Sequence, residues 1–290
     1  MLNLNYLFED SEVSFDGKAD TTGLSDYMTL DFVSGESHIY GEIMWPGKEF
    51  PSERPCVIML HGFPGSARND DISHALCRIG CVVIVPHHRG AWGSGGKYLI
   101  TNCIEDAKNL AHFARTDNFV RKYKINPDKI FLLGHSMGAN SALNAGKQLD
   151  WLRGIIMLAP YDPTRYLSGE KKVFFHSLLQ EGKILNSDGI DSIYEDVVKN
   201  AENLSFPNAV SKIEDKNLLL IAADYDSVAT KEDMVYPLWN ALQKRKGFNK
   251  NKIHRLVEFP TEHGLLGRRI SSIREIASFI AACVGDPRTY

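Results

Sequence analysis

The sequence GHSMG at residues 134–138 constrains the fold of this chain more than any other feature. It follows an apolar run at residues 130–133 and precedes a run of small residues that is typical of a packed helix. A serine on so tight a turn between a strand and a helix must adopt strained backbone dihedrals, and a side chain two residues before or after it would collide with neighbouring backbone. Gly134 and Gly138 avoid that collision. The pattern therefore predicts a nucleophile elbow that exposes the hydroxyl of Ser136.

Short apolar runs alternate with helical segments on both sides of this turn. Such continuous runs are typical of strands that are covered on both faces of a parallel sheet. The expected strands are residues 56–60, 81–85, 130–133, 154–159, 218–223 and 253–259, and the expected helices include residues 71–79, 103 to about 121, 234–244 and 269–283. This alternation predicts an α/β fold with a doubly wound, mostly parallel sheet, whose ligand site lies at the carboxyl ends of the strands.

Three segments depart from this alternation. Residues 26–33 and 38–45 alternate loosely between polar and apolar side chains, which predicts an antiparallel hairpin at a sheet edge. Residues 1–25 show no sustained period and are expected to form a tail or an edge segment, which leaves residues 26–290 as a single domain. Residues 161–212 interrupt the sheet pattern after the sixth strand, so we expect a small helical cap there.

Two stretches of the expected cap have helical spacing, at residues 172–180 and 191–204. The second is expected to bury one apolar side. That side carries Ile190, Ile193, Tyr194, Val197 and Val198.

A serine hydroxyl is a poor nucleophile near neutral pH, so it needs a base and a partner that fixes the tautomer of that base. His263 follows the strand at residues 253–259, and Asp226 follows the strand at residues 218–223. Asp224 on the same loop and Asp162 after the preceding strand are alternatives for the acid. Of the three aspartates, Asp226 has the spacing to its preceding strand that favours it as the acid. The order of serine, acid and histidine along the chain is that of the α/β-hydrolases.

In these motifs the chain resembles the α/β-hydrolase superfamily, from the first sheet strands to the C-terminus. Residues 223–228 and 261–264 are similar to its acid and histidine loops, although Ala223 stands where the family has glycine. Residues 88–96 resemble the arginine and glycine loop of the prolyl-oligopeptidase branch and of the feruloyl or cinnamoyl esterase branch. The resemblance implies a serine hydrolase that uses Ser136, Asp226 and His263.

The resemblance also implies an oxyanion hole. Its donors are expected to be the backbone amides of Phe63, in the segment HGF at residues 61–63, and of Met137. His61 and His135 flank the site and are interpreted as residues that shape its loops.

Several further side chains are possible parts of a substrate pocket. They are His88, Arg89 and Tyr161, and the aromatic residues near Tyr161 are Tyr166, Phe174 and Phe175. The simpler interpretation of Arg89 is an ion pair that holds its loop, and the simpler interpretation of the aromatic residues is packing within the cap.

Composition and charge narrow the expected partners and compartment. The net charge of −3 gives no basic field for nucleic acid, and no apolar run is long enough to span a bilayer. The start of the sequence does not read as a signal peptide, and the five cysteines form no C-x-x-C pair. We therefore expect buried thiols in a cytoplasmic protein. The glycines after Arg89 do not match a dinucleotide fingerprint. Neither a cofactor nor a metal is expected.

The expected reaction is cleavage of a small carboxylic ester through an acyl-enzyme on Ser136. One alternative is a peptidase or aminoacyl hydrolase like prolyl oligopeptidase, with a short peptide-like substrate. A second alternative is a non-catalytic binding protein on the same fold, because fold does not determine function. Such a protein is expected to carry a damaged set of catalytic residues, whereas all three are present in this sequence.

Overall fold

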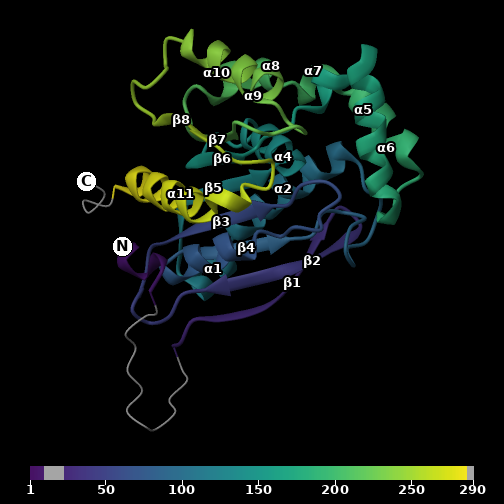
Figure 1. Cartoon of the computed structure of the whole chain (residues 1–290). Helices are drawn as coiled ribbons and strands as arrows, with labels where there is room; N and C mark the ends of the chain where they lie inside the picture. The colour runs from purple at the N-terminus through teal and green to yellow at the C-terminus, as the bar shows by residue number, and fades with distance from the viewer. Residues whose placement is uncertain (10–22, 286–290) are drawn as a thin grey trace.

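The computed structural model describes residues 1–9 and 23–285 of the 290-residue chain. Its strands form one sheet (Figure 1). They are β1 (Asp26–Ser34), β2 (Ser37–Trp45), β3 (Arg54–Leu60), β4 (Val82–Pro86), β5 (Ile125–His135), β6 (Gly154–Leu158), β7 (Asn217–Ala223) and β8 (His254–Phe259). Within the described part of the chain, no helix has the length and apolar character that crossing a membrane requires.

The strand order across the sheet is β1-β2-β4-β3-β5-β6-β7-β8. All neighbouring pairs from β4 to β8 are parallel, which confirms the predicted α/β fold with a mostly parallel sheet. The hairpin of β1 and β2 is antiparallel and lies at one edge, as predicted, and β2 runs antiparallel to β4. Because parallel strands end at the same edge of a sheet, the loops after β3, β5, β7 and β8 lie at one end of the molecule.

Helical segments connect these strands. The α-helices are α1 (Asp70–Arg78), α2 (Ile100–Ala114), α3 (Asp117–Tyr123), α4 (Met137–Gly146), α5 (Gly169–Leu179), α6 (Ile190–Lys199), α7 (Ala201–Leu204), α8 (Phe206–Ile213), α9 (Lys231–Met234), α10 (Tyr236–Gln243) and α11 (Arg269–Val284). The short 3-10 helices are η1 (Leu4–Leu7), η2 (Pro163–Tyr166), η3 (Gln180–Ile184) and η4 (Leu266–Arg268).

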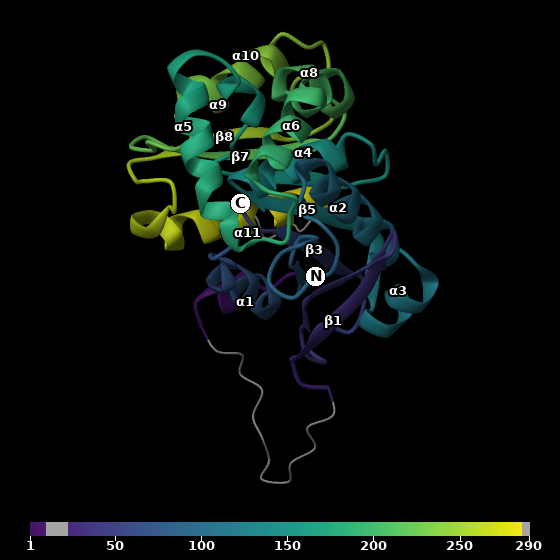
Figure 2. The same ribbon diagram turned by 90° about the vertical axis from the view of Figure 1, so that its right-hand side faces the viewer.

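Both faces of the sheet are covered. Along β5, Phe131 and Leu133 pack into the apolar core that α1 and α11 cover. The alternate residues Ile130 and Leu132 pack into the core that α2 and α4 cover. Figure 2 shows these two pairs of helices on opposite sides of the strands. Burial on both faces explains why the central strands are continuous apolar runs in the sequence.

The helix predicted from residue 103 to about 121 is in fact two helices. α2 ends at Ala114, and Thr116 adopts an extended conformation (φ −65°, ψ 145°) before α3 begins. The Thr116 hydroxyl donates a hydrogen bond of 2.8 Å to the carbonyl oxygen of Phe113, which supplies a partner at the end of α2. The rings of Phe113 and Phe119 then pack with their centroids 4.9 Å apart. A continuous helix would place these two residues on different faces.

Two further predicted helices are also divided. The helix predicted at residues 234–244 breaks before Pro237, which has no N–H to donate, so that α9 ends at Met234 and α10 begins at Tyr236. The helix predicted at residues 191–204 breaks at Asn200, which separates α6 from α7.

The segment predicted as a cap, residues 161–212, connects β6 to β7. Figure 1 shows α5 and α6 beyond the ends of the central strands, and α8 is a helix of this segment that the sequence analysis did not predict. Ile193 and Val197 of α6 are buried, whereas Val198 is 47% exposed. The predicted apolar side is therefore too wide, because Val198 follows Val197 by about 100° around the helix.

The described residues 1–9 pack against the sheet domain. Leu2 and Leu7 are buried, and the N–H of Asn3 donates a hydrogen bond of 2.9 Å to the carbonyl oxygen of Ile79. Most of the predicted tail or edge segment, residues 10–22, lies outside the described residues.

The cysteines are free, buried thiols: Cys56, Cys77, Cys81, Cys103 and Cys283. Burial raises the pKa of Cys77 and of Cys283 to about 12. Their thiols therefore stay protonated near neutral pH, and a protonated thiol is a poor nucleophile.

The packing of β2 on β4 predicts one destabilising substitution. A Cβ atom at Gly41 would lie 2.3 Å from the carbonyl oxygen of Val85, so Gly41→Ala should lower the free energy of unfolding by about 1–3 kcal/mol in urea denaturation. Gly95→Ala is the control, because its Cβ atom would meet no atom of the described residues closer than 3.5 Å. A Gly41→Ala protein as stable as the control would contradict this account of the packing.

Candidate active site

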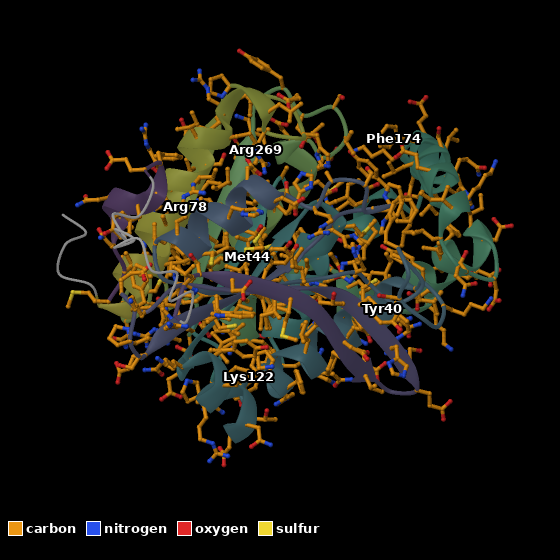
Figure 3. The ribbon with its side chains drawn as sticks, turned by 90° about the horizontal axis from the view of Figure 1, so that it is seen from below. Tyr40, Met44, Arg78, Lys122, Phe174 and Arg269 are labelled. Atoms are coloured by element: carbon orange, nitrogen blue, oxygen red, sulfur yellow. The ribbon has the colours of Figure 1, made fainter. Side chains whose placement is uncertain are left out.

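The loops that carry the predicted site residues leave the sheet at one end. In Figure 3, Tyr40 of β2 and Phe174 of α5 lie at this end, and Arg78 of α1 lies toward the opposite end. The N–H of His87, the residue after β4, donates a hydrogen bond of 2.7 Å to the carbonyl oxygen of Tyr40. The carboxyl end of β4 is thus fixed next to the edge hairpin.

Ser136 lies on a strained turn between β5 and α4. Its backbone dihedrals are φ 54° and ψ −121°, a conformation that a residue with a side chain rarely adopts. A Cβ atom at Gly134 would lie 2.1 Å from the carbonyl oxygen of Gly138, and one at Gly138 would lie 2.2 Å from that of Leu60. The two glycines are therefore required by the close approach of backbone, as the sequence pattern predicted.

The structure brings the side chains of Ser136, His263 and Asp226 together. The Ser136 hydroxyl donates a hydrogen bond of 2.9 Å to Nε2 of His263, and Nδ1 of His263 donates one of 2.7 Å to a carboxylate oxygen of Asp226. Because the carboxylate accepts, the hydrogen of the neutral ring is on Nδ1. Nε2 keeps its lone pair toward the hydroxyl, and this is the tautomer that a general base for Ser136 requires.

The surroundings of Asp226 favour its charged form. Burial by itself raises the pKa of this carboxyl, but the hydrogen bond and charge of His263, with the N–H groups of Ala229 and Val228, hold the pKa below its usual value. Those two amides lie 2.7 and 2.8 Å from the second carboxylate oxygen, and the side chain is fully buried. Asp226 is thus fixed in place as an acceptor for His263.

The two alternative acids have other partners. Asp224 accepts a hydrogen bond of 2.6 Å from the ammonium group of Lys231. Asp162 accepts hydrogen bonds from Thr164 and from the backbone N–H of Phe206. Within the described part of the chain, neither carboxylate is hydrogen-bonded to His263.

Two buried histidines support the loop at residues 61–63. Nε2 of His61 accepts a hydrogen bond of 3.0 Å from the N–H of His88, and Nε2 of His88 in turn donates one of 3.1 Å to the carbonyl oxygen of His61. The other ring nitrogen of His61 donates to the carbonyl oxygen of Gly62 at 2.8 Å. Burial lowers the pKa of His61 well below its usual value, so its ring is neutral in this network.

The backbone N–H groups of Phe63 and Met137 are the predicted oxyanion donors. Neither donates a hydrogen bond within the described residues, whereas the N–H of Ser136 donates to the carbonyl oxygen of Leu158 at 2.9 Å. Phe63 lines the same small cavity as Ser136, and Met137 begins the helix that follows the turn. Two unused donors beside the hydroxyl are the arrangement that an oxyanion hole requires.

The cavity at Ser136 has a volume of about 160 Å³. Its lining residues are Gly62, Phe63, Gly65, Ser66, Ala67, His135, Ser136 and His263. His88, Arg89 and Tyr161, the possible pocket residues, are not among these eight.

The side chains of those three residues have other partners, although the backbone N–H of Tyr161 donates a hydrogen bond of 3.1 Å to the carbonyl oxygen of Ser136. His88 supports the loop at residues 61–63, as described above. The guanidinium group of Arg89 pairs with the buried carboxylate of Asp106, with Nε 3.1 Å from its nearer oxygen, and also with Glu105 at 3.0 Å. Tyr161 is buried against the rings of Tyr166 and Phe175. These contacts agree with the simpler interpretations, an ion pair and aromatic packing.

One contact at the site has no signal in the sequence. Nε2 of His135 lies 2.9 Å from the backbone carbonyl oxygen of His263. Sequence analysis interpreted His135 only as a residue that shapes loops, because no periodicity relates positions 128 residues apart. Among the described residues, no group of His, Cys, Asp and Glu side chains is arranged to hold a metal ion.

The buried histidines predict that stability depends on pH. Burial lowers the pKa of His88 to about 4, whereas an unfolded histidine titrates near 6.5. Between these values the unfolded chain binds the additional proton, so the free energy of unfolding decreases as the pH falls from about 6.5 to about 4. The loss due to His88 is on the order of 3 kcal/mol.

His88→Gln tests this prediction. Glutamine keeps a side-chain N–H for the carbonyl of His61 but does not titrate, so urea denaturation of the variant should depend less steeply on pH over that interval. If the stability of the variant depended on pH as steeply as that of the natural chain, the loss of stability at low pH could not be assigned to His88.

Parts of this chain match a known protein family and a curated protein. The sequence profile of the family described as serine aminopeptidase, S33, matches residues 51–193. Pancreatic lipase-related protein 3 of Homo sapiens is 28% identical over 127 residues, which are 42% of this chain and 24% of that protein. The chain thus spans about a quarter of the length of this curated relative.

Two solved structures share the fold over most of the chain. The alpha/beta hydrolase GrgF from Penicillium sp. sh18 superposes with a TM-score of 0.60 and 16% identity, over 90% of this chain and 99% of that one. A protein from Bacteroides ovatus assigned as a dipeptidyl aminopeptidase IV gives a TM-score of 0.65 and 14% identity, over 92% of this chain and 36% of that one. At these identities the likeness concerns the fold alone. The family match, the sheet topology and these superpositions together show that the chain has the α/β-hydrolase fold.

Proposed function

We propose that this protein is a serine hydrolase that cleaves carboxylic esters through an acyl-enzyme on Ser136. The observation that carries the proposal is the continuous chain of hydrogen bonds from Asp226 through His263 to the Ser136 hydroxyl. Fold membership supports the reaction class only in general, because the same fold hosts several functions. The assignment of roles therefore rests on the geometry of these three side chains.

In the proposed reaction, His263 accepts the Ser136 proton as the serine oxygen attacks the ester carbonyl carbon. The carbonyl oxygen becomes an oxyanion, which the N–H groups of Phe63 and Met137 stabilise. Asp226 stabilises the imidazolium that forms on His263. The oxyanion then collapses, the bond to the alkoxide breaks, and His263 donates its proton to the leaving alcohol.

Water completes the cycle. It occupies the position that the alcohol leaves, gives a proton to His263 and attacks the acyl carbon of the ester on Ser136. Collapse of the second oxyanion releases the carboxylic acid and returns the proton to Ser136. The net reaction is the hydrolysis of one ester bond.

The lining of the cavity supports a short, uncharged acyl group. Its volume of about 160 Å³ is below the range of roughly 300–1,000 Å³ for ordinary ligand clefts. Its eight described lining residues include no Asp or Glu side chain that would pair with the ammonium group of an aminopeptidase substrate. Short-chain esters are therefore the first substrates to assay.

A peptidase or aminoacyl hydrolase is the second candidate. The match to the serine aminopeptidase profile favours it, since residues 51–193 include the elbow and the loop after β3. We predict that p-nitrophenyl acetate or butyrate is hydrolysed with a kcat/KM at least tenfold above that of aminoacyl p-nitroanilides. The opposite ranking in parallel assays would favour the peptidase.

Removal of the nucleophile gives the most direct test. Ser136→Ala should lower kcat/KM for p-nitrophenyl butyrate by about 10³-fold or more, because the covalent step is lost. Circular dichroism and the urea midpoint should stay close to those of the natural chain. A fluorophosphonate probe should label the natural protein and not the variant. Near-full activity of a folded Ser136→Ala protein, or a failure of the natural protein to react with the probe, would contradict the proposal.

The acid is tested by three matched substitutions. Asp226→Asn should reduce kcat by about 10³-fold, because an amide that donates to Nδ1 favours the wrong tautomer of His263. Asp224→Asn should leave kcat within about threefold. Asp162→Asn should affect mainly stability, through its bonds to Thr164 and Phe206. A larger loss of kcat for either control than for Asp226→Asn would reassign the acid.

A further inference from the structure

His135 immediately precedes the proposed nucleophile and contacts the backbone of the proposed base. Its Nε2 lies 2.9 Å from the carbonyl oxygen of His263, and the centroids of the two rings are 5.0 Å apart. A carbonyl oxygen only accepts, so Nε2 of His135 carries a hydrogen and donates it. Within the described part of the chain, no other hydrogen bond to the His263 carbonyl is formed.

The donor side of this contact is rigid. His135 is the last residue of β5 and is 8% exposed, between the strand and the strained turn at Ser136. The steric requirements at Gly134 and Gly138 fix the position of that turn against surrounding backbone. A hydrogen bond from His135 therefore fixes the backbone of residue 263 relative to the same rigid turn that holds the Ser136 hydroxyl.

The acceptor side has less support from the sheet. His263 lies on the loop after β8, which is the edge strand of the sheet and is mostly half-buried. Other contacts hold neighbouring residues of this loop: the N–H of Tyr225 donates to the carbonyl oxygen of Thr261, and Arg269 donates to that of Gly264. The contact from His135 joins the backbone of residue 263 to the elbow, whereas the Ser136 hydroxyl contacts its ring.

We propose that His135 is a positioning residue, whose Nε2–H holds the backbone of His263 so that the imidazole stays in line with the Ser136 hydroxyl throughout the reaction. This role rests on the proposed function, since it acts through His263. The bond between Ser136 and His263 is lost when the serine is acylated, but the bond from His135 to a backbone carbonyl is independent of every proton transfer in the cycle.

The electrostatics agree with this role. Burial, and then the nearby charge of His263 when protonated, lower the pKa of His135 to about 4. The ring of His135 is therefore neutral at the pH of the reaction. It adds no second positive charge beside the imidazolium that forms on His263, so the base keeps its ability to accept the serine proton.

Three substitutions of His135 test the role of the donor. His135→Gln places an amide N–H where Nε2–H lies, His135→Asn is one methylene too short to reach the carbonyl, and His135→Leu has no donor. With p-nitrophenyl butyrate, we expect kcat to fall by about 10- to 100-fold in the Asn and Leu variants, because small misplacements of a catalytic group have effects of this size. The Gln variant should keep at least a fifth of kcat, and KM should change by less than threefold in all three.

His254 offers a matched control for a purely structural effect. It is also a buried histidine, and its Nε2 lies 3.0 Å from a backbone carbonyl oxygen, that of Lys216, at the start of β8. His254→Leu should lower the urea midpoint without changing kcat of the folded protein. Because the Gln and Asn variants differ by one methylene, they give the answer even if the Leu variant does not fold.

The outcomes separate this proposal from the proposed function. If Ser136→Ala abolishes hydrolysis while the Asn and Leu variants keep kcat within twofold of the natural chain, the positioning role is wrong and the reaction stands. Equal losses in the Gln and Asn variants would also overturn the role of the donor. Full activity of Ser136→Ala would instead reject the proposed function itself.

Discussion

The close approach of Gly138 to the end of β3 is the contact on which the rest of the site depends. A Cβ atom at this position would lie 2.2 Å from the carbonyl oxygen of Leu60 and 2.4 Å from that of His61. Without a side chain there, α4 begins directly against β3. The loop that carries the N–H of Phe63 and the helix start that carries the N–H of Met137 then lie on either side of Ser136. Every residue of α4 is buried, so packing around the helix sustains the strained conformation of the serine.

Neutral, buried histidines hold the loops around this turn. His61 and His88 exchange hydrogen bonds between the loops after β3 and β4, and His135 joins the end of β5 to the loop after β8. A neutral imidazole suits this task, since it offers one donor and one acceptor without the cost of burying a charge. The same residue type thus serves as the proposed base at position 263, where the ring is 21% exposed, and as a structural bridge where burial is nearly complete.

The parts of this structure that the sequence predicted are those that local chemistry determines. The strands buried on both faces appear as apolar runs, and the elbow appears through Gly134 and Gly138, because each constraint acts within a few residues. The break at Thr116 was missed, since it depends on how Phe113 and Phe119 pack in three dimensions. The contact between His135 and His263 was missed for the same reason: it joins two loops whose proximity follows only from the order of β5 to β8 in the sheet. The acid was left open between three carboxylates, and hydrogen bonding to His263 distinguishes Asp226 from the other two.

The segment between β6 and β7 is attached to the domain separately from the proposed catalytic side chains. The carboxylate of Asp162 accepts the N–H of Phe206, which closes the base of this segment across 44 residues, and Asp233 of α9 accepts hydrogen bonds from Lys171 and Tyr166 within it. Gly182 of this segment lies against the ring of Phe63, because a Cβ atom at Gly182 would lie 2.3 Å from that ring. The backbone of Phe63 is oriented by the histidine network beneath it, whereas its side chain faces the inserted helices. Changes in the insertion therefore act on the ring, and so on the space beside Ser136, while the hydrogen bonds that join Asp226, His263 and Ser136 remain anchored in the sheet.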